Sequence, residues 1–141
     1  MKLVISDPKT GKAYNLELDE SKERILVGLG LGKTIDASSL GLSGYTIMLT
    51  GGCDKDGFPM RRDIHGRVRQ QVILSGPPGF NPKEHGLRKR KRLRGNVITP
   101  EIVQVNAKII KAGKKSLAEI LGQATEEQAA ETAVEKKGKK K

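Results

Sequence analysis

One strand can be read directly from the sequence: residues 103–109 are Val103-Gln104-Val105-Asn106-Ala107-Lys108-Ile109. Apolar and polar side chains alternate along the whole stretch. A period of two places the apolar side chains on one face of a β-strand and the polar side chains on the other. The stretch therefore predicts a strand that packs one face against a hydrophobic core.

Outward from this strand, the chain offers more short β-like runs between loops rich in glycine and proline. Residues 3–5 and 13–18 flank a loop that contains proline and glycine, which is typical of a β-hairpin. Residues 45–50 and 67–74 are two further strand candidates. The first of these is expected to stop at Gly51, where a glycine pair begins.

The connecting segments complete a mainly β prediction. Residues 19–27 suit a short helix that follows a capping side chain, and residues 28–34 are expected to form a flexible loop. Residues 1–122 then form a small β-barrel-like domain of about five or six short strands. A short C-terminal helix closes it with one apolar face, made by Leu117, Ile120 and Leu121. Residues 123–141, rich in Ala, Glu and Lys, hold too little apolar surface to fold and are expected to be disordered.

Positive charge is concentrated in one third of the chain. The 141 residues carry a net charge of +11, and residues 58–95 alone hold 11 basic and 2 acidic side chains. The densest part, Arg88-Lys89-Arg90-Lys91-Arg92-Leu93-Arg94, places six cations in seven positions. Charges this dense repel one another unless a polyanion lies opposite, and nucleic acid binds them with release of condensed counterions. The region between 58 and 95 is therefore a candidate nucleic-acid interface.

The candidate contacts are the basic side chains and one histidine of this region. Arginine predominates, and its planar guanidinium binds phosphate through two hydrogen bonds and stacks on bases. Aromatic side chains make up only 3% of the chain, so recognition of the phosphates and shape of folded RNA fits better than stacking on aromatic rings. The predicted RNA-binding residues are Arg61, Arg62, His65, Arg67, Arg69, Lys83, Arg88, Lys89, Arg90, Lys91, Arg92 and Arg94.

A nucleotide site is poorly supported, although residues 28–34 end in Gly32-Lys33-Thr34. The phosphate-binding loop of nucleotide hydrolases needs a glycine where this chain has Val27. The dinucleotide-binding pattern needs its third glycine at Lys33, and no buried parallel strand precedes the stretch.

Metal and catalytic sites are equally weak. Asp54-Lys55-Asp56-Gly57 lacks the further oxygen ligands of a calcium loop and predicts a turn. Cys53, His65 and His85 share no zinc-site spacing. No serine lies in a nucleophile elbow, and no carboxylate pair stands out in the basic region. We expect no catalytic residue, no metal and no cofactor, and the protein is not expected to be an enzyme.

The sequence also indicates a cellular setting. A single cysteine provides no disulfide framework and fits a reducing cytoplasm. The apolar stretch at the N-terminus is too short for a signal peptide, and no stretch approaches the roughly 20 apolar residues of a membrane span. A cytoplasmic protein without a membrane partner is expected.

Four sequence blocks carry a family resemblance: Gly51-Gly52-Cys53-Asp54-Lys55-Asp56-Gly57-Phe58-Pro59-Met60-Arg61, His65-Gly66-Arg67-Val68-Arg69, Gly86-Leu87-Arg88-Lys89-Arg90-Lys91 and Arg94-Gly95-Asn96. Together they resemble small-subunit ribosomal protein six of the archaeal and eukaryotic type. The resemblance implies a small β-rich domain bound to small-subunit rRNA beside neighbouring ribosomal proteins, with no homo-oligomer expected. The short chain resembles archaeal members, and the phosphorylated arginine- and serine-rich stretch of eukaryotic members has no counterpart in it.

The resulting hypothesis is a structural component of the small ribosomal subunit that binds rRNA through residues 58–95. Two alternatives stay open at this point. The first is a free-standing RNA- or DNA-binding regulatory protein, which would need a sequence-reading element of its own. The second is a nucleotide-dependent enzyme, which the glycine spacing opposes.

Overall fold

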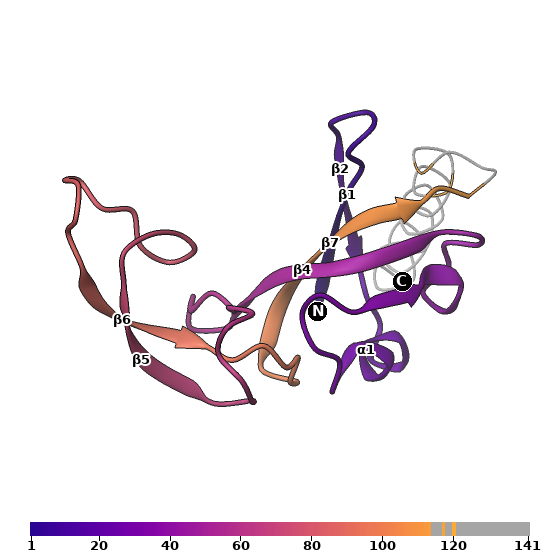
Figure 1. The fold of residues 1–141 in the computed structure, drawn as a ribbon. Coiled ribbons are helices and arrows are strands. Elements are labelled where there is room, and N and C mark those ends of the chain that lie inside the picture. The colour runs from indigo at the N-terminus through magenta and orange to yellow at the C-terminus, as the bar shows by residue number, and fades with distance from the viewer. Residues whose placement is uncertain (114–116, 118–119, 121–141) are drawn as a thin grey trace, which may run out of the picture.

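The computed structural model describes residues 1–113 together with Leu117 and Ile120. In these residues it contains seven strands, one α-helix and one 3-10 helix (Figure 1). In chain order they are β1 (Lys2–Ser6), β2 (Ala13–Glu17), α1 (Glu20–Leu26), β3 (Thr34–Asp36), η1 (Ala37–Leu40), β4 (Thr46–Asp54), β5 (Arg69–Leu74), β6 (Lys89–Arg94) and β7 (Ile102–Lys111). The mainly β prediction is confirmed, and the strands are divided between two sheets.

The larger sheet has five strands in the order β2-β1-β7-β4-β3. β7, which contains the alternating stretch, is the central strand: it pairs parallel to β1 and antiparallel to β4. β1 and β2 form the expected antiparallel hairpin. The helix also forms as expected, with Asp19 at the N-cap position, but the Asp19 side chain makes no capping hydrogen bond.

The core lies on one face of this sheet. Val105, Ala107 and Ile109 of β7 are buried, as the alternation predicts. They pack with buried aliphatic side chains from β1, β4, α1 and η1, namely Leu3, Ile5, Ile47, Leu49, Leu26 and Leu40. Full burial of one such side chain stabilises the fold by about 1.5–3 kcal/mol. Leu117 is buried and Ile120 partly buried against the same core, whereas Leu121 and the predicted tail lie outside the described residues.

Val103 is the exception to the alternation, since 48% of it is exposed. The pairing explains why: Gln104 is opposite Cys53 and Ile102 is opposite Asp54, so β7 has one extra residue between them. Such a bulge leaves the extra residue unpaired and reverses the facing of the residues beyond it. Ile102 therefore enters the core in place of Val103.

The strand expected to end at Gly51 instead continues to Asp54. Gly52 is required there because a Cβ on it would lie 2.7 Å from the Gln104 carbonyl oxygen and 2.9 Å from Sδ of Met60. The glycine pair therefore allows a close approach of neighbouring chain segments and does not terminate the strand.

The expected flexible loop at residues 28–34 is a fixed connection in the structure. The amides of Gly28 and Leu31 donate to the carbonyls of Ile98 and Asn96, at 2.9 and 2.8 Å. Gly32 N donates to Leu49 O at 2.7 Å, and β3 begins two residues later. The glycine spacing could not indicate this docking, because the partners lie on β4 and on the segment after β6.

The second sheet is a two-stranded antiparallel ribbon of β5 and β6. We call residues 69–94, which are β5, β6 and the connection between them, the basic ribbon. It extends away from the five-stranded sheet, beyond the end of β4 (Figure 1). It has a small hydrophobic cluster of its own, formed by Ile64, Leu74 and Leu93 with Val72 and Phe80 packed against them.

Candidate nucleic-acid interface

The densest cationic run is a strand, because residues 89–94 pair with β5 along their whole length. Opposite residues of an antiparallel pair point to the same face. Arg90 faces Ile73, and Arg92 faces Gln71. The cross-strand pairing thus places alternate arginines on one face of the basic ribbon, which we call the arginine face.

The arginine face is open to solvent. Arg90 and Arg92 are exposed, and Ile73 opposite Arg90 is 63% exposed. Within the part of the chain that the structure describes, neither arginine forms an ion pair. This face therefore offers unpaired guanidinium groups around an uncovered aliphatic side chain.

The opposite face of the basic ribbon is partly covered by the chain itself. Leu74 and Leu93 are 3% and 1% exposed and belong to the small cluster with Ile64. The connection between β5 and β6 folds back onto this face, where Phe80 packs against the cluster. Lys89 and Lys91 share the parity of Leu93 but stay exposed toward the far end of the ribbon.

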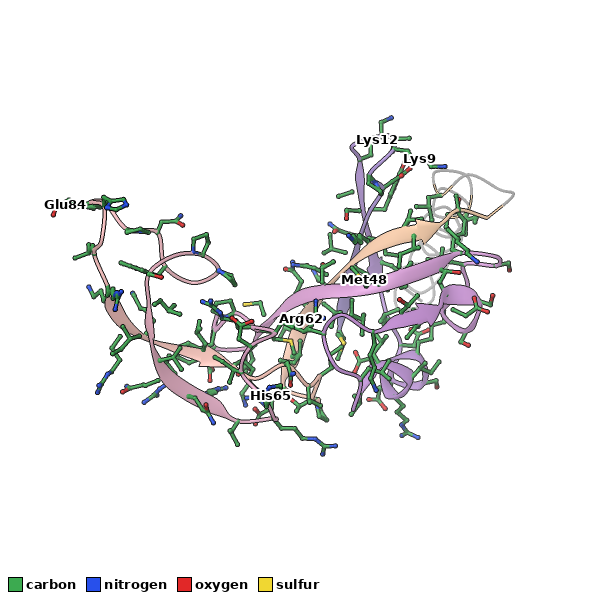
Figure 2. The ribbon with its side chains drawn as sticks, viewed as in Figure 1. Lys9, Lys12, Met48, Arg62, His65 and Glu84 are labelled. Carbon is green, nitrogen blue, oxygen red and sulfur yellow. The ribbon has the colours of Figure 1, made fainter. Side chains whose placement is uncertain are left out.

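The remaining predicted residues flank the base and the far end of the basic ribbon. His65 and Arg67 are exposed on the loop before β5, and Lys83 and Arg88 are exposed on the connection before β6. Arg62 is exposed too, and its guanidinium packs against Gly32. Figure 2 shows Arg62 and His65 near the base of the ribbon.

The loop at residues 61–67 is held to the end of β6. Asn96 Oδ1 accepts a hydrogen bond from Gly66 N at 3.2 Å, and Asn96 Nδ2 donates to the Arg62 carbonyl at 3.3 Å. Arg61 Nε donates to Asp63 Oδ2 at 2.8 Å, so part of its guanidinium is engaged within the loop. The loop is therefore fixed against the base of the basic ribbon.

Arg69 and Arg94 are placed differently from the other predicted residues. They are opposite each other at the base of the ribbon, and both contact Asp54 at the end of β4. Arg69 Nη2 lies 2.6 Å and Arg94 Nη1 3.0 Å from Asp54 Oδ2. The Asp54 side chain is completely buried. One carboxylate of the larger sheet thus joins both strands of the basic ribbon.

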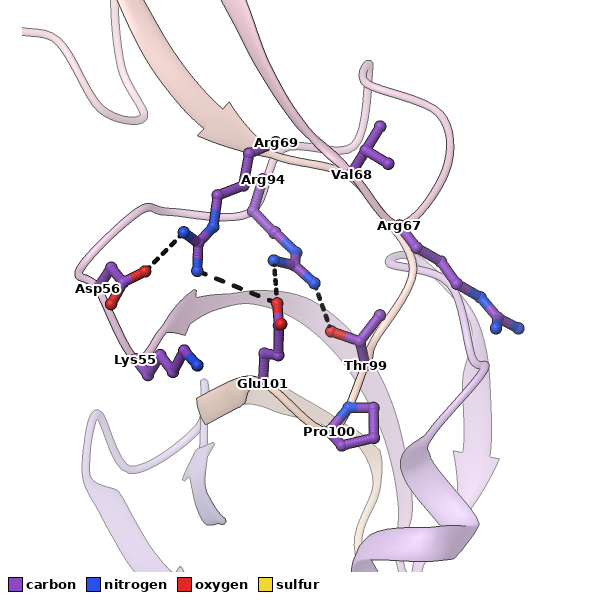
Figure 3. Close-up of a pocket in the computed structure, with 9 residues that line it drawn as sticks. All are labelled: Lys55, Asp56, Arg67, Val68, Arg69, Arg94, Thr99, Pro100 and Glu101. Atoms are coloured by element: carbon purple, nitrogen blue, oxygen red, sulfur yellow. Dashed lines mark hydrogen bonds and ion pairs between the residues drawn. The ribbon is translucent and has the colours of Figure 1, made fainter.

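Further contacts complete this junction. Arg94 Nη1 lies 2.6 Å from Glu101 Oε2, and Arg94 Nη2 donates to Thr99 Oγ1 at 2.7 Å. Arg69 Nη1 lies 2.6 Å from Asp56 Oδ2. The junction lines an open pocket, where Figure 3 shows Arg69 and Arg94 converging on the carboxylates. The hydrogen bond to Asp54 raises the pKa of Arg69, so this guanidinium stays charged.

Sequence reasoning missed the role of the carboxylates at the junction. The sequence predicts only a turn at Asp54 and Asp56, and that turn does form, with Gly57 N donating to Asp54 O at 2.9 Å. The sequence does hold one signal for this role: Asp54, Asp56 and Glu101 lie on either side of a segment rich in arginine. Buried carboxylates need such partners.

The match to known proteins covers the whole described fold. A sequence model of the family described as "Ribosomal protein S6e" matches residues 1–122. The chain belongs to the ribosomal protein S6e family. The resemblance found in the sequence is therefore confirmed.

Individual relatives of the S6e family agree. "Small ribosomal subunit protein eS6" of Methanocaldococcus jannaschii is 50% identical over 121 residues, which are 86% of this chain and 90% of that protein. The proteins of the same name from Methanocella arvoryzae and Archaeoglobus fulgidus are 51% and 46% identical over 119 and 126 residues. These matches cover 84% and 89% of this chain, and 84% and 98% of the relatives.

Two further features, a metal-binding cluster and a membrane-spanning helix, are absent from the residues that the structure describes. The described residues contain no group of three or more His, Cys, Asp or Glu that could hold a metal ion. None of the helices within residues 1–113 is long and apolar enough to cross a membrane.

Proposed function

We propose that this S6e-family chain is a structural component of the small ribosomal subunit that binds rRNA through the basic ribbon and the loop at residues 61–67. The observation that carries the proposal is the exposed arginine face within a chain that belongs to a ribosomal protein family. Its partners are then small-subunit rRNA and neighbouring ribosomal proteins in the cytoplasm. The role needs no catalytic residue and no cofactor.

The arginine face suits RNA phosphates for a physical reason. Arg90 and Arg92 repeat at every second residue of one strand, so their Cα atoms are about 7 Å apart along it. Each can bind a phosphate through two hydrogen bonds, and neither is used within the described fold. The exposed Ile73 opposite Arg90 adds apolar contact area against sugars or base edges.

The predicted contact residues then divide into two groups. The first group reaches the RNA, and it consists of Arg61, Arg62, His65, Arg67, Lys83, Arg88, Lys89, Arg90, Lys91 and Arg92. Arg69 and Arg94 form the second group: they hold the basic ribbon against Asp54 and so orient the first group. A cationic strand held at a fixed angle loses less conformational entropy on binding than a free tail.

Co-sedimentation tests this proposal most simply. A tagged chain expressed in an archaeal host should travel with small subunits in a sucrose gradient after a high-salt wash. A chain found only as a free pool would contradict the proposal and favour a free-standing RNA- or DNA-binding regulatory protein.

Salt dependence tests the phosphate contacts separately. If about four to six phosphates are neutralised, log affinity falls with log salt at a slope of roughly −3 to −5. Filter binding of the isolated chain to an rRNA fragment measures this slope. A slope near zero would remove the electrostatic argument.

A further inference from the structure

We propose that the lysines at the opposite end of the five-stranded sheet form a second RNA contact, so that one copy of the chain bridges two RNA segments. This inference rests on the proposed function, because it takes RNA as the ligand. The second contact consists of four exposed side chains, which we call the lysine edge: Lys9, Lys12, Lys108 and Lys111.

The topology of the sheet brings these lysines together. β1 and β7 are parallel neighbours, with Ser6 opposite Lys108, so both strands end at the same edge of the sheet. The β1–β2 turn follows β1 there, and Figure 2 shows Lys9 and Lys12 at its tip. Lys111 ends β7 at the same edge. Residues from both ends of the described chain therefore lie at the same end of the sheet.

The turn that presents Lys9 and Lys12 is internally bonded. Asp7 Oδ1 accepts a hydrogen bond from Lys9 N at 2.9 Å, and Asp7 Oδ2 accepts one from Thr10 Oγ1 at 2.9 Å. The backbone closes the turn, with Asp7 N donating to Lys12 O at 2.9 Å. The Asp7 carboxylate thus binds within its own turn, and the hydrogen bond from Lys9 N lowers its pKa.

Asp36, another acidic group at this edge, is also engaged. Asp36 ends β3, which pairs with the beginning of β4 next to Lys111. Its Oδ1 accepts hydrogen bonds from Ser38 N at 3.0 Å and Ser38 Oγ at 2.8 Å. These bonds lower the pKa of Asp36 and direct its carboxylate at η1. Neither carboxylate forms an ion pair with the lysine edge.

Ion pairs of the larger sheet lie at the other end instead. Lys2 pairs with Glu17 at 3.4 Å, Lys22 lies 4.0 Å from Asp19, and the N-terminal ammonium group binds Glu23. Within the described residues, no lysine of the lysine edge has such a partner. Such an uncompensated group of cations suits a polyanion.

The two cationic surfaces are far enough apart to act independently. β7 has 10 residues and runs from the junction with the basic ribbon to the lysine edge. At about 3.3 Å per residue its ends are roughly 30 Å apart. Charges this distant are screened from each other, because the Debye length is about 8 Å at physiological ionic strength. Each surface is therefore expected to bind its own RNA segment, because the two groups of charges do not act as one combined electrostatic field.

A bridging assay with the full chain tests the second contact. Two short RNA duplexes of the same sequence carry a donor and an acceptor dye, and energy transfer reports their capture by one protein. At protein concentrations below those of the duplexes, the wild-type chain should give energy transfer. Sedimentation velocity, run in parallel, reports whether the chain stays monomeric.

The deciding variant replaces Lys9, Lys12, Lys108 and Lys111 with Gln. It should lose the energy transfer and still bind one duplex, with an affinity within about threefold of wild type because the distant charges are screened. A charge-matched control replaces Lys2, Lys22, Arg24 and Lys33 with Gln and should keep the energy transfer.

The outcomes separate the two proposals. If energy transfer survives in the lysine-edge variant, the second contact is overturned and the proposed function stays intact. The same conclusion follows if the charge-matched control loses as much energy transfer as the lysine-edge variant. A wild-type chain that binds single duplexes without energy transfer overturns it as well. A wild-type chain that binds no RNA at all contradicts the proposed function itself.

Discussion

The five-stranded sheet and the basic ribbon are both β-structure, but different forces hold them. The sheet packs one face on a core of buried aliphatic side chains from five elements. The ribbon has two buried apolar residues, Leu74 and Leu93, which pack with Ile64 of the preceding loop, and it is joined to the sheet by an ion network around Asp54. The apolar core therefore sets the stability of the fold, whereas the network sets the orientation of the surface that we assign to RNA.

The basic ribbon is expected to be locally less stable than the five-stranded sheet. Segments with few buried apolar contacts open at a lower free energy than the core of the same protein. We expect the amides of β5 and β6 to exchange with solvent faster than those of β7. We expect RNA bound at the arginine face to stabilise the folded ribbon, because a ligand that binds only the folded form shifts the equilibrium toward it.

The largest expected effect compares one substitution in each region. Ile47→Ala, in the core of the sheet, should lower the free energy of unfolding by about 4 kcal/mol, because a fully buried side chain leaves a cavity between packed elements. Leu93→Ala should cost about 2 kcal/mol, since the small cluster of the ribbon can collapse around the gap. Urea unfolding of both variants measures the difference. Equal costs would mean that the ribbon shares the core of the sheet.

The next prediction targets the junction. Asp54→Asn leaves Arg69 and Arg94 without the buried carboxylate that both contact, and breaking a buried ion pair from one side costs about 3 kcal/mol. Asp56→Asn is the matched control: its carboxylate is 47% exposed, so its loss should cost about 1 kcal/mol or less. Thermal unfolding and RNA affinity are measured together. If Asp54→Asn changes neither, the network does not hold the ribbon.

A smaller effect is expected at the glycine pair of β4. Gly52→Ala should lower the free energy of unfolding by about 2 kcal/mol, because the new Cβ meets the backbone oxygen of Gln104 and the sulfur of Met60. Gly51→Ala is the control, since no atom lies within 4 Å of the Cβ that it would add. Similar costs at the two positions would show that the close approach at Gly52 is not what constrains β4.

Much of the fold could be predicted from local sequence patterns. The hairpin, the short helix and the central strand follow from periodicity and turn residues within ten positions of each other. The bulge at Val103 could not be predicted, because it depends on how β7 aligns with β4. The continuation of β4 through Gly52 depends on Met60 and Gln104, which are close to it only in the folded chain.

The candidate site shows the same division. Charge density identified the region, but all its arginines look alike in the sequence. Arg69 and Arg94 differ from Arg90 and Arg92 through their contacts at the junction, above all with Asp54, which lies 15 and 40 residues away from them. Separating the arginines that orient the ribbon from those that face solvent therefore required the contacts of the folded chain.

The central claim is that the arginine face of the basic ribbon binds RNA as a defined surface and not as a total charge. Two variants with equal charge loss test it: Arg90→Gln with Arg92→Gln on the arginine face, and Lys89→Gln with Lys91→Gln on the opposite face. All four side chains are exposed, so folding should be unaffected in both variants. Filter binding to an rRNA fragment should show a loss of about 1–3 kcal/mol for the arginine pair and a clearly smaller loss for the lysine pair. Equal losses would contradict the claim, because only the number of charges would then matter.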